Sequence, residues 1–397
     1  MKLAALVLVS VCATAAEVPA GGVLSIRLQT GLAASAAKSG QTLEAVVIAP
    51  LKDYTGAVLV PAHSKLTGKI KDLRIAQSPE DRAQVRLVFD RITSPSGVAA
   101  KIDARVAAVD NARETVDEKG DIVGILASET LGAKMDRGIG KLAERYPALG
   151  TILAGVKAGV VQQVNPDIRY DPGVEMNLRV EKPFTWNPGA GPDAGLPVIA
   201  SEADLAKLVN KQPFRTVAEN PPDPSDITNL MFLGTEADIT AAFQAAGWTP
   251  AHARDRESTM ETIRAVIEQR GYKEAPVSLL LLDGRPPDLV FQKQNNTFAS
   301  RHHLRIWRRP GSFNDRPVWV CAATHDVAID FSEDNHTFVH RIDPHIDRER
   351  SKVTADLTFT GKVKAVSMID RDKVPKLAQN ATGDDLITDG RMSVVEF

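Results

Sequence analysis

Cysteine is scarce in this sequence of 397 residues, which contains only Cys12 and Cys321. The two are too far apart for a CxxC pair, so a cysteine-based zinc motif or a dithiol redox centre is excluded. An excess of one charge is also missing, since 48 Lys and Arg stand against 50 Asp and Glu, for a net charge of −2. This balance gives no general attraction to nucleic acid or to an acidic membrane surface, and we expect no nucleic-acid partner.

Signature motifs of catalysis are missing as well. The sequence has no HExxH, no GxSxG and no glycine loop with phosphate-binding spacing, which excludes the common zinc-peptidase, α/β-hydrolase and P-loop classes. What remains, 43% hydrophobic and 25% charged residues, is typical of a globular protein. A chain of this length exceeds what one hydrophobic core usually serves, so we expect more than one domain.

The N-terminus combines a charge, an apolar run and small residues. Lys2 precedes the apolar residues 3–12, and Ala-Thr-Ala follows at 13–15. This order predicts a secretory signal peptide over residues 1–16 and hence a periplasmic or secreted protein. The apolar run is shorter than the roughly 20 residues of a membrane span. The alternative to a signal peptide is a first strand or a short core helix. We expect no transmembrane helix in the mature chain.

Short β-prone segments fill the N-terminal part of the chain. VLSIRL at 23–28, QVRLVFDRI at 84–92 and KIDARVAAV at 101–109 are examples, and turn signals separate them. Strands at such regular spacing favour a small antiparallel barrel or sandwich, so we predict a β-barrel-like domain over residues 17–186. Residues 128–164 are rich in Ala and Gly and predict a helical excursion from this domain.

Two turn-rich stretches follow, NPGAGPDAGLP at 187–197 and PPDPSD at 221–226. They predict a linker over residues 187–223 that contains one short helix, at 201–211, with Ser201 as its cap. Beyond it we predict a second domain over residues 224–371 and a C-terminal tail over residues 372–397.

The second domain shows helices first and strands afterwards. A β-prone segment at 227–234 precedes a helix that starts at Thr235 and is stopped by Gly247, and a second helix is expected at 259–270. Strands are expected at 301–307 and 317–329, and a last one near 356–363. This order indicates an α+β layer domain, so the predicted class is α+β overall with an all-β, barrel-like N-terminal domain.

Polar residues gather in one window of the sequence. Residues 301–350 hold six of the eight histidines, together with eight Arg, eight Asp or Glu and no Lys. Imidazole changes charge near neutral pH and is the commonest metal ligand, and Arg suits carboxylate and phosphate. In an extended strand His302 and His303 point to opposite faces, so the two cannot ligate one ion from mid-strand.

The candidate site combines these separated segments. Zinc takes nitrogen and carboxylate ligands, and an Asp often orients a ligating His, so a divalent metal such as zinc is the candidate cofactor. The candidate metal ligands are His325 and His340 together with either His302 or His303. The candidate catalytic residues are Asp326 and Asp343, and the candidate anion-binding residues are Arg301 and Arg305. The competing interpretation is a network of Arg, His and Asp that satisfies buried polar groups, and the equal number of acids and arginines favours it.

Longer motifs in the second domain carry a family resemblance. They include NLMFLG at 229–234, AFQAAGW at 242–248, RHHLRIW at 301–307 and HRIDPHIDRER at 340–350. Through them, residues 224–371 resemble the LssY C-terminal domain family. The resemblance implies an association with type I secretion and with membrane modules, but no enzymatic role for these residues. Residues 58–70 more weakly resemble the secretion β-barrel of the TraB/TrbI type, with His63 in place of the usual Gly, which implies an envelope location.

These observations lead to two expectations of function. The first is an exported cell-envelope protein with a binding or scaffolding role in envelope assembly or secretion, whose partners are envelope or membrane proteins. The second is a metal-dependent hydrolase, for example a phosphoesterase, that uses the His and Asp cluster of the second domain. The two differ in whether the imidazoles converge on an open cleft.

Overall fold

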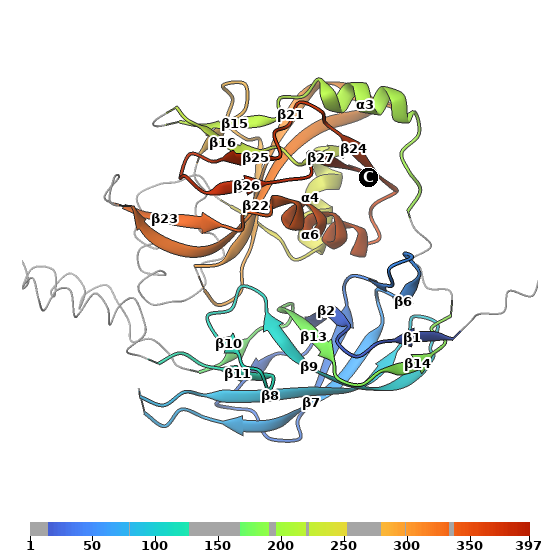
Figure 1. The fold of residues 1–397 in the computed structure, drawn as a ribbon, viewed down its shortest axis with the longest axis vertical. Helices are drawn as coiled ribbons and strands as arrows, with labels where there is room; N and C mark the ends of the chain where they lie inside the picture. The colour runs from blue at the N-terminus through green and yellow to red at the C-terminus, as the bar shows by residue number, and fades with distance from the viewer. Residues whose placement is uncertain are drawn as a thin grey trace, which may run out of the picture.

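The computed structural model describes residues 15–78, 80–126, 167–189, 196–219, 222–251, 279–297, 299–332 and 337–397. Figure 1 shows a barrel made by the N-terminal part of the chain and, above it, a second domain built on a sheet. Residues 1–14 of the predicted signal peptide, the helical excursion at 128–164 and the helix at 259–270 lie outside the described residues.

The N-terminal domain is a closed barrel of six strands, as the regular strand spacing predicts. The strands follow the order β8-β7-β4-β2-β13-β9, and pairing of β8 with β9 closes the barrel. They are β2 (Val23–Leu28), β4 (Thr42–Val47), β7 (Lys65–Arg74), β8 (Gln84–Thr93), β9 (Ala99–Val109) and β13 (Glu175–Val180). All of these pairs are antiparallel.

Alternation along the strands fills the interior of the barrel. In β2 the side chains of Leu24, Ile26 and Leu28 are buried and the residues between them are more exposed. Gly68 lets β7 lie close to β8, because a Cβ at this position would stand 2.6 Å from the carbonyl oxygen of Val88 and 2.7 Å from the ring of Phe89. Apolar side chains thus fill the interior of the barrel.

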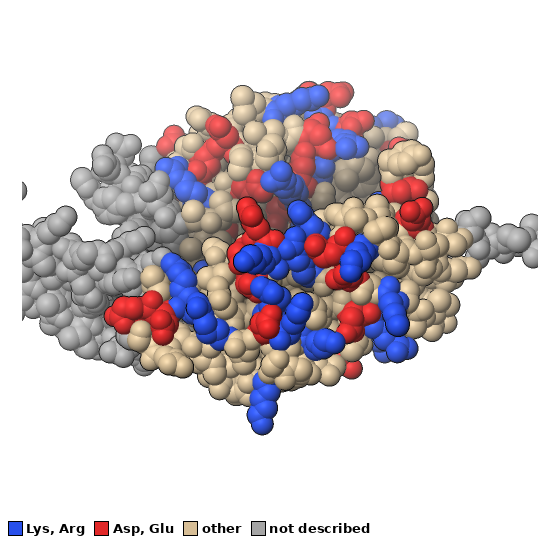
Figure 2. All heavy atoms as spheres, turned by 60° about the horizontal axis from the view of Figure 1, so that its bottom comes forward, with Lys and Arg blue, Asp and Glu red and all other residues tan. Residues whose placement is uncertain are grey.

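The described part of the N-terminal domain also contains eight shorter strands outside the six of the barrel. Their bounds are β1 (Ala16–Val18), β3 (Leu32–Ala33), β5 (Leu51–Lys52), β6 (Val58–Val60), β10 (Thr115–Val116), β11 (Asp121–Val123), β12 (Arg169–Tyr170) and β14 (Phe184–Trp186). Figure 2 views the underside of the barrel, where Lys and Arg are interspersed with Asp and Glu. This face therefore presents both signs of charge.

The C-terminal domain is built on one large sheet with strand order β18-β20-β21-β22-β17-β27-β24, and β23 pairs with β22. The strands are β17 (Leu230–Leu233), β18 (Thr249–Pro250), β20 (Leu289–Lys293), β21 (Arg301–Phe313), β22 (Arg316–Ser332), β23 (Thr337–Ile342), β24 (Ala365–Asp370) and β27 (Arg391–Glu396). Two smaller sheets lie beside it, made of β15 (Arg215–Ala218), β16 (Pro224–Ile227) and β19 (Leu280–Leu281), and of β25 (Leu377–Gln379) and β26 (Asp385–Ile387).

Helices cover both faces of the large sheet. α4 (Glu236–Ala245) and α6 (Ile346–Phe359) pack Phe243 and Leu357 against Leu304 and Ile306 of β21. α3 (Glu202–Asn210) packs on the other face, against a core that includes Trp307. In Figure 1, α4 and α6 lie on the side of the sheet that faces the barrel, so this side carries the contact between the domains.

Helix α4 follows the sequence closely. Thr235 and Asp238 form a capping box at its start, and Gly247, with φ +84°, stands just beyond its end. The cap expected for α3 is different: Ser201 has φ +64° and its side chain makes no capping hydrogen bond.

Three other expectations change. Strand accounts for 47% and helix for 11% of the described residues, so this part of the chain is mostly β and the α+β class applies to it only loosely. The first half of the strand expected near 356–363 is instead the end of helix α6, because Val353 and Leu357 turn toward the sheet with helical spacing. Residues 372–397, predicted as a tail, contain β25, β26 and β27, and β27 lies between β17 and β24 in the large sheet.

Candidate functional site

The hairpin of β21 and β22 separates the predicted site residues onto two faces of the sheet. Its register places Arg301 opposite Asp326 and His302 opposite His325. Because side chains alternate along each strand, the His302 pair faces the barrel and the Arg301 pair faces away from it. The predicted ligands His302, His303, His325 and His340 therefore do not meet at one point.

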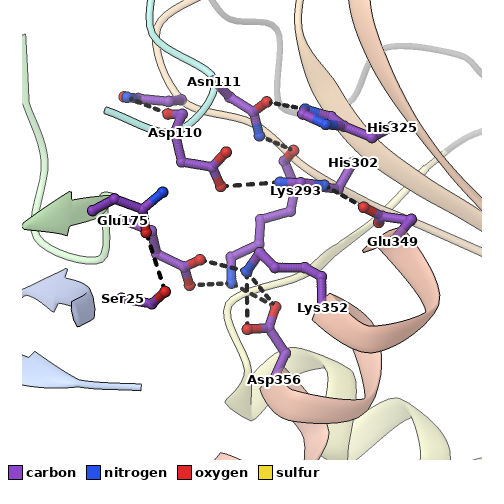
Figure 3. Close-up of polar contacts among 12 residues, drawn as sticks. Ser25, Asp110, Asn111, Glu175, Lys293, His302, His325, Glu349, Lys352 and Asp356 are labelled. Carbon is purple, nitrogen blue, oxygen red and sulfur yellow. Dashed lines mark hydrogen bonds and ion pairs between the residues drawn. The ribbon is translucent and has the colours of Figure 1, made fainter. Parts of the chain in front are cut away.

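On the face toward the barrel, His302 is held between two carboxylates. Its Nδ1 lies 2.7 Å from Oε2 of Glu349 in α6, and its Nε2 lies 2.9 Å from Oδ2 of Asp110. Asp110 belongs to the barrel domain and follows β9 directly. The ring of His325 stacks on that of His302, with centroids 4.1 Å apart and an angle of 22° between the planes. Figure 3 shows Asp110 and Glu349 approaching His302 from opposite sides.

The charges of these neighbouring groups shift one another's pKa values. Although burial opposes the charged form, Glu349 and Asp110 raise the pKa of His302 to about 10. The pKa of Asp110 falls well below its usual range because the positive charge of His302 outweighs the effect of burial. Burial lowers the pKa of His325, and the neighbouring His302 lowers it further. One imidazolium thus lies between two carboxylates, with a neutral imidazole stacked on it.

Asn111 attaches the same loop of the barrel domain to the sheet. Its Oδ1 lies 2.8 Å from Nε2 of His325, and its Nδ2 donates to the carbonyl oxygen of Lys293 at 3.3 Å. The backbone of Asn111 is left-handed, with φ +50°, a conformation that Asn tolerates better than most residues. Asn295 adds a hydrogen bond of 3.0 Å from its Nδ2 to the carbonyl oxygen of Asp110.

A second set of charges joins the two domains next to this loop. Glu175 of β13 accepts hydrogen bonds from Lys293 and Lys352 of the C-terminal domain and from Arg27 of β2. Asp356 of α6 pairs with both lysines. Figure 3 shows Glu175 reaching from the barrel toward Lys293 and Lys352, which also contact Asp356.

Burial and pairing shift the pKa values in this cluster. Although burial opposes its charge, Lys352, Lys293 and Arg27 hold the pKa of Glu175 well below its usual range. Burial lowers the pKa of Lys293 against the opposing effect of Asp356. Although burial also opposes the charge of Lys352, Asp356 and Glu175 raise its pKa. The cluster is a buried ion-pair network that crosses the domain boundary.

The two domains enclose a cleft of about 410 Å³ at this boundary. The barrel contributes Ser25, Ile48, Asp110, Glu175, Met176 and Asn177, and the C-terminal domain contributes His302, His325, Asp343, His345, Arg348, Glu349 and Lys352. The carboxylate of Asp343, a predicted catalytic residue, accepts from the backbone N–H of His345 at 2.9 Å and from Arg348 at 3.2 Å. Of the predicted site residues, His302, His325 and Asp343 thus line the cleft.

On the opposite face, Asp326 is the centre of a separate network. Its Oδ2 accepts from Nε of Arg301 at 2.9 Å and lies 3.2 Å from Nδ1 of His340, and its Oδ1 lies 3.5 Å from Nδ1 of His303. His303 Nε2 lies 2.9 Å from the hydroxyl of Thr324. The order hydroxyl, imidazole and carboxylate resembles a catalytic triad, but Thr324, His303 and Asp326 are all buried.

The charged groups on this face are paired within one domain. Burial lowers the pKa of both His303 and His340. Although burial opposes its charge, the surrounding His303, His340 and Arg301 hold the pKa of Asp326 below its usual range. Arg301 is the permanent cation among them. Arg305, the other predicted anion-binding residue, pairs with Asp226 at 3.2 Å. Both arginines therefore already bind carboxylates of the protein.

Several residues of the interdomain site were not identified from the sequence. They are Asp110, Asn111, Glu175, Lys293, Glu349, Lys352 and Asp356. Glu349, Lys352 and Asp356 could have been found from their spacing of three and four residues. This spacing places them on one face once residues 346–359 are recognised as a helix. Asp110 and Asn111 follow directly after a predicted strand, which is a common location for binding residues.

Residues 211–392 of the chain match the family described as LssY C-terminus. The C-terminal domain is therefore similar to this family, and the matched residues make up less than half of the chain. The match confirms the resemblance predicted for residues 224–371 and extends beyond it at both ends, to include β15, β25 and β26. Comparison with curated proteins gives no match. None of the helices in the described part of the chain has the length and apolar character of a membrane span.

Proposed function

We propose that this chain is an exported cell-envelope protein with a binding or scaffolding role in envelope assembly or secretion. The observation that supports the proposal best is the buried ion-pair network around Glu175, which joins the barrel to the C-terminal domain. Buried pairs of this kind need matched geometry to offset the loss of hydration, so they favour one relative placement of the domains. A fixed two-domain body is suited to presenting surfaces to partners.

The chemistry of the cleft also favours binding over catalysis. Both ring nitrogens of His302 are occupied by carboxylates, and Glu175 is shared among three cations. Asp326, the other predicted catalytic carboxylate, is bonded to Arg301 on the far face of the sheet. A general acid or base needs a proton-transfer atom directed at a substrate, whereas these atoms are directed at each other.

Export is tested separately from binding. Fusion of the first 30 or so residues to a reporter that is active only outside the cytoplasm should give activity, and N-terminal sequencing should find a start near Ala16 or Glu17. An intact Met1 in the cytosolic fraction would contradict export.

Binding is tested by photo-crosslinking in the native cell. Tyr54 in the turn between β5 and β6 is fully exposed, and Leu377 of the C-terminal domain is 67% exposed. A crosslinker at either position should give a discrete adduct with an envelope protein, and one at the buried Val85 should give none. If a scan of exposed positions on both domains yields only the uncrosslinked chain, the scaffolding role is wrong.

A metal-dependent hydrolase is the second candidate, because Asp110, His302 and His325 approach one another at the edge of the cleft. Asp343 lines the same cleft and would be the base. The purified full chain with added zinc should then hydrolyse simple phosphoesters, and Asp343→Asn should abolish the activity. Turnover that Asp343→Asn leaves intact would be a contaminant and would count against this candidate.

A further inference from the structure

We propose that Asp110, His302 and His325 bind one divalent transition-metal ion of the zinc class at the boundary between the two domains. Each residue offers one ligand atom, and these atoms all lie within 4.8 Å of one another. The carboxylate comes from the barrel and both imidazoles come from the C-terminal sheet. The ion would therefore connect the two domains directly.

The donor set suits this class of ion. Two imidazoles and one carboxylate are typical ligands of catalytic zinc, which keeps a fourth position for water. Ligand atoms around tetrahedral zinc stand roughly 3.3 Å apart, as follows from bonds of about 2.0 Å. Nε2 of His302 and Oδ2 of Asp110, at 2.9 Å, are already this close. His325 completes the set by turning out of its stack with His302, which shortens ligand distances that are now up to 4.8 Å.

The surroundings orient His302 as they orient a metal ligand. Glu349 holds Nδ1 at 2.7 Å, which leaves Nε2 directed toward Asp110. A carboxylate behind a ligating imidazole fixes the ring and makes it a better donor. The ion would take the position between Nε2 of His302 and Oδ2 of Asp110, which now face each other at 2.9 Å. His325 likewise exchanges its contact with Asn111 for the ion.

The cleft provides access and space. Its volume of about 410 Å³ is open to Asp110, His302 and His325, with room for water as the remaining ligand. The network around Asp326 is different, because Asp326, Arg301 and His303 do not line this cleft. Within residues 301–350, an ion that enters through the cleft therefore meets His302 and His325 and not the network around Asp326.

The test uses the full chain, stripped of metal, and zinc chloride alone as the probe. Calorimetric titration should give one zinc per chain, and the melting temperature should rise with zinc. His325→Gln and Asp110→Asn should each weaken zinc binding at least 100-fold, and Glu349→Gln should weaken it about 10- to 100-fold. His325→Gln is the more informative ligand variant, because Asp110→Asn also perturbs domain docking.

Two controls make the result specific. His345→Gln removes an imidazole that lines the same cleft but is not in the ligand group, and His340→Gln removes one from the opposite face of the sheet. Both should keep the affinity of the wild type. The proposal is overturned if the wild type binds no zinc at micromolar concentrations, or if His345→Gln weakens binding as much as His325→Gln. Neither hydrolysis nor scaffolding is assumed, so a failure of either function leaves this test intact.

Discussion

The two faces of the β21–β22 hairpin carry similar residues but have different surroundings. On one face, His302 and His325 bond to Asp110 and Asn111 of the other domain and border a cleft. On the other, Arg301 and His303 surround Asp326, which belongs to the same hairpin. Along one strand, alternate positions thus take part in the contact between the domains, and the positions between them pack in the interior of the C-terminal domain.

The comparison separates two roles for buried charge. Asp326 has cationic and imidazole partners within its own domain, so its network contributes to the stability of that domain alone. Glu175 and Asp110 have partners across the boundary, so their networks contribute to the placement of one domain on the other. Variants on the two faces should therefore differ in what they disrupt as well as in how much.

The largest effect is expected for Asp326→Ala. The substitution removes the buried carboxylate that pairs with Arg301, which should lower the free energy of unfolding by about 4 kcal/mol. Chemical denaturation of the full chain measures the loss. Lys207→Ala is the matched control, because its pair with Asp204 is more than two thirds exposed and is worth less than about 1 kcal/mol. A loss for Asp326→Ala as small as that of the control would contradict the role of this network.

Glu175→Gln should act on the domain boundary instead. It removes the carboxylate charge that Lys293, Lys352 and Arg27 share, at a cost of about 3 kcal/mol in docking. We expect two domains that remain folded but separate, seen as a larger radius of gyration in X-ray scattering and faster proteolysis between them. Glu181→Gln is the control, because Glu181 pairs with Arg105 within the barrel. An unchanged radius would show that the other contacts are sufficient for docking.

Acid should reproduce part of this effect. The pKa of Glu175 lies well below its ordinary value of 4.5 in the folded chain, so its contribution is complete above about pH 4.5. The contribution is lost as the pH falls toward the lowered pKa, because the unfolded or undocked chain then takes up a proton more readily. The stability difference between wild type and Glu175→Gln should shrink below pH 4.5. A difference that stays constant down to pH 3 would exclude this titration.

The face of the hairpin that carries Arg301 and His303 could be predicted from local periodicity and composition. Alternation along residues 301–307 correctly separated His302 from His303, and the equal numbers of Arg and acids correctly favoured pairing for Arg301 and Arg305. The barrel was predictable for the same reason, because strands with one buried face alternate and are separated by turns.

The interdomain half could not be predicted from a pattern. Asp110 and His302 are 192 residues apart, and no local rule brings the end of a barrel strand to a sheet in another domain. The end of the helix that supplies Glu349 and Lys352 was predicted as a strand, because Leu357-Thr358-Phe359 has the composition of a strand. Tertiary packing of Val353 and Leu357 outweighed that local preference.

The smallest effect concerns Asn111, which links the barrel loop to His325. Asn111→Gly keeps the left-handed backbone available and removes two side-chain hydrogen bonds, to His325 and Lys293, so it should cost about 1 kcal/mol. Asn111→Ala removes the same bonds and also places a Cβ of poor conformational tolerance at φ +50°, so it should be less stable than Asn111→Gly by about 1 kcal/mol. Thermal melts of both variants measure the difference. Equal melting temperatures would mean that the side chain of Asn111, and not its backbone conformation, determines how the loop meets the sheet.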